Sequence, residues 1–479
     1  FKRDLRLLDN EGLQDAINNG LPLLLLYVME PSLEENPHYH KRHHNFIAQS
    51  LVALNVELKQ FDTQVHIYKS EVTEALDSIQ ANMKVNTLFS MQETGLNATY
   101  ARDKAVKKWC ESKRIVWKEH INNGVTRGIN NRNSWRKTWT SYMMQPIKSF
   151  EASAASFTAA DNIGLAEEVL EPKKLEGIQA GGTKTGLAYL ESFLSQRHKK
   201  YQQSISKPEA ARTHCGRVSP YIAWGNLSVR YVWQRAKLAK AQGASGFQFN
   251  AFTSRLRWQA HFIQKFEMET RMEFESVNTG FRQLKKEVNT GYINAWKTGK
   301  TGYPLVDASM RCVIETGYLN FRMRAMIVSF FTHHLWQPWQ MGAVFLGKQF
   351  LDFEPGIHYR QFQMQAGETG INMLRIYNPT KNALDHDPEG AFIRKWVPEL
   401  AQLPTPFVLE PWSMTALEQQ AYSCVLGKDY PKAIVTIKET YKHASTVLWH
   451  MKRNPTVRRE SKRILAMHTL PDRENIMDR

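Results

Sequence analysis

The spacing of hydrophobic positions predicts alternating helices and strands at the start of the chain. Residues 11–20 and about 39–61 have amphipathic helical patterns, and the apolar run LPLLLLYVM at 21–29 has the length of a buried strand. Two further short runs with β character lie at 64–70 and 85–91. Strands that alternate with helices are typical of a parallel sheet covered by helices. We therefore expect a doubly wound, Rossmann-like α/β domain over residues 1–140.

The pattern changes after residue 150. Residues 151–183 are rich in Ala, Ser and Gly, which is typical of a segment between domains. From about 184 to 450 the helical period dominates, as in SVRYVWQRAKLAKA. We expect a linker over 141–183 and an all-α domain over 184–479, with its basic last 30 residues forming a solvated helix and tail. Since the chain opens at Phe1 within a pattern, we also expect a few residues of a first strand to precede it.

The charge balance favours an anionic partner. Lys and Arg exceed Asp and Glu by 17, and basic side chains gain free energy when they displace phosphate counterions. The same excess is compatible with simple solubility or with an anionic cofactor. No run approaches the ~18 apolar residues of a membrane span, so we expect a soluble protein without membrane contact.

The cysteines and histidines predict no metal centre. The chain has no CxxC motif, and its four cysteines are dispersed, which suggests a reducing compartment, cytoplasmic or nuclear: Cys110, Cys215, Cys312 and Cys424. His40, His43 and His44 have metal-like spacing on an expected helix. A solvated basic face is the preferred interpretation of these histidines.

The stretch WKTGKTGYPLVDASMR at 296–311 imitates a phosphate loop. Such a loop needs a glycine separated by four residues from Gly-Lys-Thr, and counting back from Gly299 places Asn294 at that position. The lead-in is mixed and short, whereas a phosphate loop follows a buried strand. The sequence therefore argues against a nucleotide triphosphate site.

Five blocks resemble the photolyase and cryptochrome family, in the family's order. They are FKRDLRLLDN (1–10), GRVSPYIAWGNLSVR (216–230), WKTGKTGYPLVDASMR (296–311), MRAMIVSFF (323–331) and RIYNPTKNALDHDPEGAFIRKWVPEL (375–400). The resemblance runs from residue 1 to about 450. It implies a helical domain that binds U-shaped FAD, and a first domain that often holds a folate or deazaflavin antenna. It also implies a monomer that acts on UV-damaged DNA, where light-excited reduced FAD lends an electron to a pyrimidine dimer.

The resemblance assigns a phosphate side to the expected FAD site. Tyr201 and the turn that opens the second block match these contacts: Cys215, Gly216, Arg217, Val218 and Ser219. Cys215 and Gly216 stand where hydroxyl residues are usual, although Gly216 can still offer its backbone N–H. The alternative is that Ser219-Pro220 simply begins a helix.

On the ring side, Arg324 and Asp352 match an Arg–Asp pair that lies against the flavin, and Glu354 falls at a second carboxylate position. His358 falls where the family varies the residue that faces the redox-active nitrogen, usually Asn in repairing members. A histidine there is expected to donate a proton or a hydrogen bond to that nitrogen. The alternative is a solvated turn, with the register off by one.

The lesion-binding positions depart from the family pattern. Trp258 is retained, and it is expected to stack on an extruded base. Arg255 replaces the glutamate that bonds thymine, and a guanidinium cannot accept a hydrogen bond. Gln259, which we also place among the flavin contacts, and Ala260 replace an Arg-Glu pair, and Met364 replaces a second tryptophan.

The tryptophan relay of the family is incomplete here. Trp296 and Trp339 match its outer members, with Trp296 as the expected surface end, whereas Phe362 takes the inner position and is not oxidisable. Tyr359 is a candidate substitute, and core packing is the alternative for both tryptophans. Residues 93–109 resemble a helix start in the antenna domain without identifying an antenna.

We therefore expect a light-driven DNA photolyase. The departures at the lesion pocket keep open a cryptochrome-type blue-light photoreceptor that binds FAD without efficient repair. A flavin-free DNA-binding scaffold is disfavoured by Arg324, Asp352 and the phosphate block.

Overall fold

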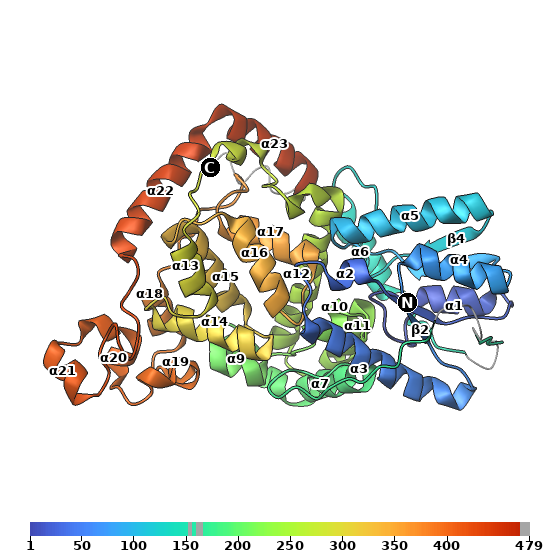
Figure 1. The fold of residues 1–479 in the computed structure, drawn as a ribbon, viewed down its shortest axis with the longest axis horizontal. Helices are drawn as coiled ribbons and strands as arrows, with labels where there is room; N and C mark the ends of the chain where they lie inside the picture. The colour runs from blue at the N-terminus through green and yellow to red at the C-terminus, as the bar shows by residue number, and fades with distance from the viewer. Residues whose placement is uncertain (152–155, 160–165, 470–479) are drawn as a thin grey trace.

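The computed structural model of the protein describes residues 1–151, 156–159 and 166–469. Figure 1 shows a smaller α/β part around the N-terminus and a larger helical part, with α22 and α23 forming an arm along its outer side. The expected α/β plus all-α class is confirmed. In the described part, no helix combines the length and the apolar character that crossing a bilayer requires.

The strands of the α/β part form two parallel pairs. β1 (Leu26–Met29) pairs with β2 (His66–Lys69), and β3 (Thr87–Met91) pairs with β4 (Val116–His120). The strand β4 was not predicted from the sequence. The flanking helices are α1 (Glu11–Asn18), α2 (Pro31–Glu34), α3 (Lys41–Leu58), α4 (Val72–Asn82) and α5 (Asn97–Lys113). The apolar run at 21–29 is a regular strand only from Leu26, because Leu26 pairs with His66, the first residue of β2. Earlier in the run, Leu23 forms an isolated bridge with Phe157.

A helix crosses the boundary that we expected at residue 140. α6 (Trp135–Met144) buries Trp135, Trp139 and Met143, and the ring of Trp139 lies 6.4 Å from that of Trp233 on α11 (Val229–Ala241). Between α6 and α7 (Thr183–Ser195), the described residues contain no helix or paired strand segment longer than a single bridge. Residues 152–155 and 160–165 of the expected linker lie outside the described residues.

The helical part packs around α12 and α17. Besides α7 and α11, the α-helices of this part are α8 (Tyr201–Ser204), α9 (Pro208–His214), α10 (Ser219–Ala223), α12 (Gly246–Met268), α13 (Thr290–Lys297), α14 (Pro304–Thr316), α15 (Phe321–Ser329), α16 (Trp339–Gln349), α17 (Pro355–Gln365), α18 (Pro379–His386), α19 (Ala391–Trp396), α20 (Thr405–Leu409), α21 (Ala416–Ala421), α22 (Ile437–Arg453) and α23 (Pro455–His468). A Cβ on Gly356 would lie 2.7 Å from the Ile263 Cα, so glycine permits the close approach of α17 to α12.

The loop that imitates a phosphate loop binds a carboxylate of the chain itself. The Thr301 N–H and hydroxyl and the Gly302 N–H donate to the carboxylate of Asp307, on α14, as does the Tyr430 hydroxyl at 2.6 Å. Asp307 is fully buried, and this burial raises its pKa to about 6. The loop is therefore held to the first turns of α14 by the Asp307 side chain, and these donors are already used within the protein.

Candidate functional site

The two halves of the expected flavin site meet around Tyr318, which precedes α15. The Arg217 guanidinium lies 3.7 Å from the centroid of the Tyr318 ring. Burial raises the pKa of the Tyr318 hydroxyl, and Cys215, Arg217, Arg324 and Asp352 all act on it electrostatically. Residues more than a hundred positions apart in the sequence therefore share one site.

Arginine side chains dominate the phosphate side. Arg217 has a φ of 58°, and its Nη2 donates to Gln179 Oε1 at 2.8 Å, while its buried Nε has no hydrogen-bond partner among the described residues. Arg212 lies 5.6 Å from the Tyr318 ring, and Arg255 is within hydrogen-bonding reach of the Tyr201 hydroxyl. A group of cations with an unpaired donor suits a dianionic pyrophosphate, which accepts charge-assisted hydrogen bonds.

Two side chains donate hydrogen bonds to backbone carbonyls of the turn from Cys215 to Ser219. Arg197 donates to the carbonyls of Cys215 and Gly216, and Gln179 donates to the Arg217 carbonyl at 2.9 Å. Ser219 and Pro220 do begin α10, as the alternative interpretation requires. The contact between Arg217 and Tyr318 shows that the turn also faces the other half of the site.

The ring side contains the expected Arg–Asp pair. Nη2 of Arg324, on α15, lies 2.9 Å from both carboxylate oxygens of Asp352, in the loop between α16 and α17. Nε of Arg324 donates to the Leu319 carbonyl at 2.7 Å, and its guanidinium stacks 3.9 Å from the Phe350 ring centroid. These contacts fix the guanidinium plane, and Arg324 is the one side-chain partner of the Asp352 carboxylate in the described part of the chain.

Glu354 does not join the Arg324–Asp352 pair and instead faces Arg3. Its nearest cation is Arg3, at 3.6 Å, and Arg3 also donates to the carbonyls of Ala223 and Phe353. Burial raises the pKa of Glu354. The N-terminal loop therefore braces the segment that carries Asp352, a role of Arg3 that no sequence motif indicated.

His358 is not free to donate in the way that we expected. It is buried on α17, and its Nε2 lies 2.8 Å from the carbonyl of Ala343, which makes Nε2 the protonated nitrogen. Burial lowers the pKa of His358 to about 3. The neutral ring has one proton, and that proton is already given to Ala343. Nδ1 is left as an acceptor, and the expected donation to a flavin nitrogen stays a prediction that this contact does not favour.

The lesion-side residues lie on α12 and α17. Trp258 is 40% exposed, which leaves its ring available for stacking, and it packs edge-on against His261 at 4.9 Å. Arg255 turns toward Tyr201 and lies 5.0 Å from the Phe321 ring, near the residues expected on the phosphate side. Gln259 and Met364 are half-buried on these helices.

The aromatic path differs from the expected one at its outer end. Trp296 is fully buried, packs 4.4 Å from Phe331 and donates to the Ile327 carbonyl, so it is not a surface terminus. Trp339 lies 6.1 Å from Tyr359, an oxidisable ring, and Phe362 lies 4.9 Å from His358. The geometry therefore places Tyr359, whose hydroxyl bonds to His38, next to Trp339.

The histidines at the start of α3 are not a solvated face. His43 is fully buried, its Nε2 lies 2.9 Å from the Phe350 carbonyl, and burial lowers its pKa to about 3. His40 caps α3 by accepting from the Arg42 N–H. Among the described residues, no group of three or more His, Cys, Asp or Glu side chains is arranged to hold a metal ion.

Comparison with known proteins gives consistent matches along the chain. Residues 1–140 match the family model described as DNA photolyase, and residues 252–450 match the FAD binding domain of DNA photolyase. A deoxyribodipyrimidine photo-lyase from Alkalihalophilus pseudofirmus is 24% identical over 93% of this chain and 96% of its own length. A cryptochrome DASH from Gloeobacter violaceus is 24% identical over 91% and 92%. The crystal structure of a Synechocystis cryptochrome superimposes with a TM-score of 0.85 at 22% identity, covering 93% of this chain and 98% of that one.

Proposed function

Because the chain belongs to the photolyase and cryptochrome family, we propose that it is a light-driven, FAD-dependent DNA photolyase that splits UV-induced pyrimidine dimers. The observation that carries the proposal is the convergence of Arg217, Tyr318 and the Arg324–Asp352 pair on one site. Bound FAD supplies a donor that light excites. The other steps depend on what the side chains of this protein bind and orient.

In the proposed arrangement, the pyrophosphate is held by Arg217, Arg255 and Tyr201, and the turn from Cys215 to Ser219 lies beside it. Asp352 would accept from a ring N–H of bound FAD, and Arg324 would balance negative charge on that ring. His358 lines the ring pocket as a neutral acceptor at Nδ1. These are the charge-assisted contacts that a buried anionic cofactor needs.

DNA is the proposed partner, bound by a monomer in the cytoplasm, or in the nucleus of a eukaryote. Chemistry on a base inside a duplex requires that the base leave the stack. The exposed ring of Trp258 offers a surface on which an extruded base can stack. Gln259 and Met364, half-buried on α12 and α17, are the other proposed lesion-side residues. The net charge of +17 supports contact with the phosphate backbone.

The test is direct repair. Photoreduced protein is illuminated with DNA that contains either cyclobutane dimers or 6-4 products, single- or double-stranded, and the remaining lesions are counted. We expect loss of one lesion type, and a weaker effect in Trp258→Ala. Absence of repair on every substrate, in protein that has bound FAD, would contradict the photolyase proposal. The absorption spectrum of the same sample shows whether a second, antenna chromophore is bound.

A cryptochrome-type photoreceptor is the second candidate, and particular residues favour it. Arg255 and Met364 remove a hydrogen-bond acceptor and a stacking ring from the lesion pocket, and Phe362 interrupts the inner relay. For this candidate we expect bound FAD and a long-lived light-induced spectrum without repair.

A further inference from the structure

Tyr359 and His38 form a buried contact between the helical part and the α/β part. Tyr359 is on α17, and His38 lies in the turn between α2 and α3. The Tyr359 hydroxyl bonds to Nε2 of His38, and both side chains are buried. The contact therefore joins an oxidisable phenol to a ring nitrogen that can exchange a proton.

The hydrogen bonds of His38 determine which of its nitrogens is free to accept. The amide oxygen of Asn36 accepts from the His38 backbone N–H at 3.1 Å, and Nδ1 of His38 lies 2.8 Å from the same oxygen. Since an amide oxygen only accepts, Nδ1 carries the ring proton. Burial lowers the pKa of His38 to about 4, so the ring is neutral near pH 7 and Nε2 has no proton. The Tyr359 hydroxyl therefore donates to Nε2.

Packing holds the His38 ring in this orientation. It stacks on the Phe353 ring, with the centroids 5.7 Å apart and an angle of 11° between the planes. Asn36 contacts one nitrogen of the ring, and Tyr359 contacts the other. A base that is held in this way needs no reorganisation when the phenol gives up its proton.

Tyr359 also contacts Trp339, which the family resemblance places in the electron relay. The two ring centroids are 6.1 Å apart, and the rings are nearly perpendicular. Nε1 of Trp339 donates to Ser276 Oγ at 3.1 Å, and Ser276 donates in turn to the Glu368 carboxylate at 2.6 Å. A positive charge on Trp339 can therefore be relieved in two ways, by loss of its own proton toward Ser276 or by an electron from Tyr359.

We propose that Tyr359 and His38 act together as a proton-coupled electron donor to Trp339, an inference that rests on the proposed photochemistry. When Trp339 has lost one electron to light-excited, oxidised FAD, Tyr359 replaces that electron, and its hydroxyl proton moves to Nε2 of His38. The O–H bond of Tyr359 breaks, an N–H bond forms on His38, and Trp339 is restored. The products are a neutral tyrosyl radical and an imidazolium. An electron that later returns to Tyr359 takes the proton back from His38.

The proton acceptor decides whether a buried tyrosine can give up an electron. Burial raises the pKa of the Tyr359 hydroxyl, so the side chain is a neutral phenol before the reaction. A phenol that loses an electron becomes a strong acid, and an unpaired cation in an apolar interior is costly. Transfer to His38 avoids that cation. Both N–H groups of the resulting imidazolium have acceptors, at Asn36 and at Tyr359, and charge-assisted hydrogen bonds of this kind are strong.

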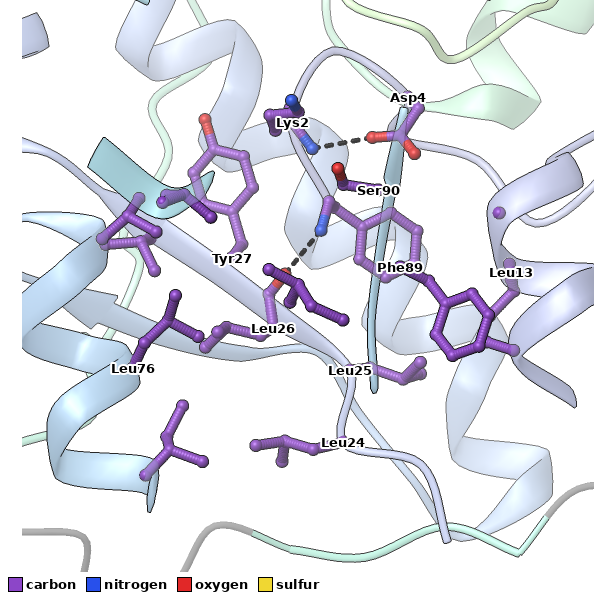
Figure 2. Close-up of a pocket in the computed structure, with 18 of the residues that line it drawn as sticks. Lys2, Asp4, Leu13, Leu24, Leu25, Leu26, Tyr27, Leu76, Phe89 and Ser90 are labelled. Atoms are coloured by element: carbon purple, nitrogen blue, oxygen red, sulfur yellow. Dashed lines mark hydrogen bonds between the residues drawn. The ribbon is translucent and has the colours of Figure 1, made fainter. Parts of the chain in front are cut away.

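The pair is separate from the large pocket of the α/β part. That pocket has a volume of about 470 Å³ and is lined by residues of β1 and β3, among them Leu26 and Phe89 (Figure 2). Its lining includes Tyr39 but neither His38 nor Tyr359. On the side of the helical part, the Phe266 ring stacks on Tyr359 at 6.0 Å. The proton that His38 receives therefore stays within the pair, where it is available for the return step.

The test detects the radical that a blue flash forms in FAD-loaded, oxidised protein. Neutral tyrosyl and tryptophanyl radicals differ in their absorption bands and in their EPR spectra. We expect a tyrosyl radical that forms more slowly in heavy water than in ordinary water, because a proton moves with the electron. Tyr359→Phe should lose this signal and leave a tryptophanyl radical. Tyr303→Phe is the matched control and should keep it, because the buried Tyr303 donates to the Val435 carbonyl at 2.7 Å and has no base there.

His38→Gln tests the proton acceptor. A glutamine oxygen can accept the hydrogen bond of Tyr359 but is too weak a base to keep its proton. We therefore expect loss of the tyrosyl radical in this variant as well, with the FAD content and the thermal unfolding measured as checks of the fold. Nitrogen NMR of the apoprotein gives a readout without flavin, and it should show His38 protonated at Nδ1.

Several results would overturn the proposal. They are a tyrosyl radical that survives in Tyr359→Phe or in His38→Gln, a His38 ring protonated at Nε2, and a flash that forms no protein radical. A tryptophanyl radical alone in the unchanged protein would instead assign the proton loss to Trp339, through Ser276 and Glu368. Repair is measured separately with chemically reduced FAD, which needs no electron from Trp339. Absence of repair there would contradict the photolyase proposal and leave this one standing.

Discussion

Replacing Asp352 by asparagine removes the charge that faces Arg324 and keeps the shape of the side chain. In the protein, Arg324 Nη2 donates to both carboxylate oxygens at 2.9 Å. An amide can accept only one of these bonds, and its NH2 group opposes the guanidinium. The pair would therefore lose its geometry at the point where the flavin ring is expected.

The magnitude follows from the contact and its exposure. A hydrogen bond between charged groups contributes about 1.5–3 kcal/mol. The side chain of Arg324 is 27% exposed and that of Asp352 is 10% exposed, so solvent screens the pair in part. We therefore use the lower figure, about 1.5 kcal/mol, which corresponds to an approximately tenfold weaker Kd for FAD.

The assay titrates FAD into apoprotein and follows the quenching of flavin fluorescence, with thermal unfolding as a check of the fold. Glu119→Gln is the matched control, because Nη1 of Arg127, also 27% exposed, lies 3.0 Å from both oxygens of Glu119 in the α/β part. We expect the control to bind FAD like the unchanged protein. An unchanged Kd in Asp352→Asn, or an equal loss in the control, would refute the assignment of Asp352 to the flavin.

Three further predictions concern a buried histidine on α3, the contact between α12 and α17, and the aromatic path. His43 has its pKa lowered to about 3 by burial, so the unfolded state binds the extra proton below pH 6.5 and stability falls as the pH decreases. Urea unfolding at pH 7.0 and 5.5 should show that His43→Gln recovers about 1.2 kcal/mol of the loss, and an unchanged pH dependence would contradict this. Gly356→Ala should destabilise by about 1–3 kcal/mol, because its Cβ would lie 2.7 Å from the Ile263 Cα. Gly246→Ala, at the start of α12, should be close to neutral in the same denaturant series, because its Cβ would meet only the flexible end of the Lys240 side chain, at 3.3 Å. Phe362→Trp should speed the photoreduction of bound FAD several-fold under blue light by placing an oxidisable ring at the inner position, and an unchanged rate would show that Tyr359 or another path already suffices.

The helix and strand pattern was well predicted from local sequence. The helices at 11–20 and 39–61 and the strands at 64–70 and 85–91 lie where the spacing of apolar residues placed them, since that spacing depends on neighbours a few positions apart. The strand β4 was missed, because VWKEH is mixed in polarity and lies at the edge of its pair. The helix α6 crosses the boundary expected at residue 140, because its buried Trp139 packs against Trp233 on α11 and its buried Trp135 packs against His261 on α12.

At the site, the sequence determined which residues are present, and the fold decided what each can do. Arg324 lies in a family block and Asp352 lies between two blocks; the resemblance predicted that they pair, and their salt bridge is present. Nothing in the blocks showed that Trp296 is fully buried or that the proton of His358 is given to the Ala343 carbonyl. Burial and hydrogen-bond partners depend on groups brought together from distant parts of the chain, so only the tertiary structure defines the charge, tautomer and exposure of these side chains.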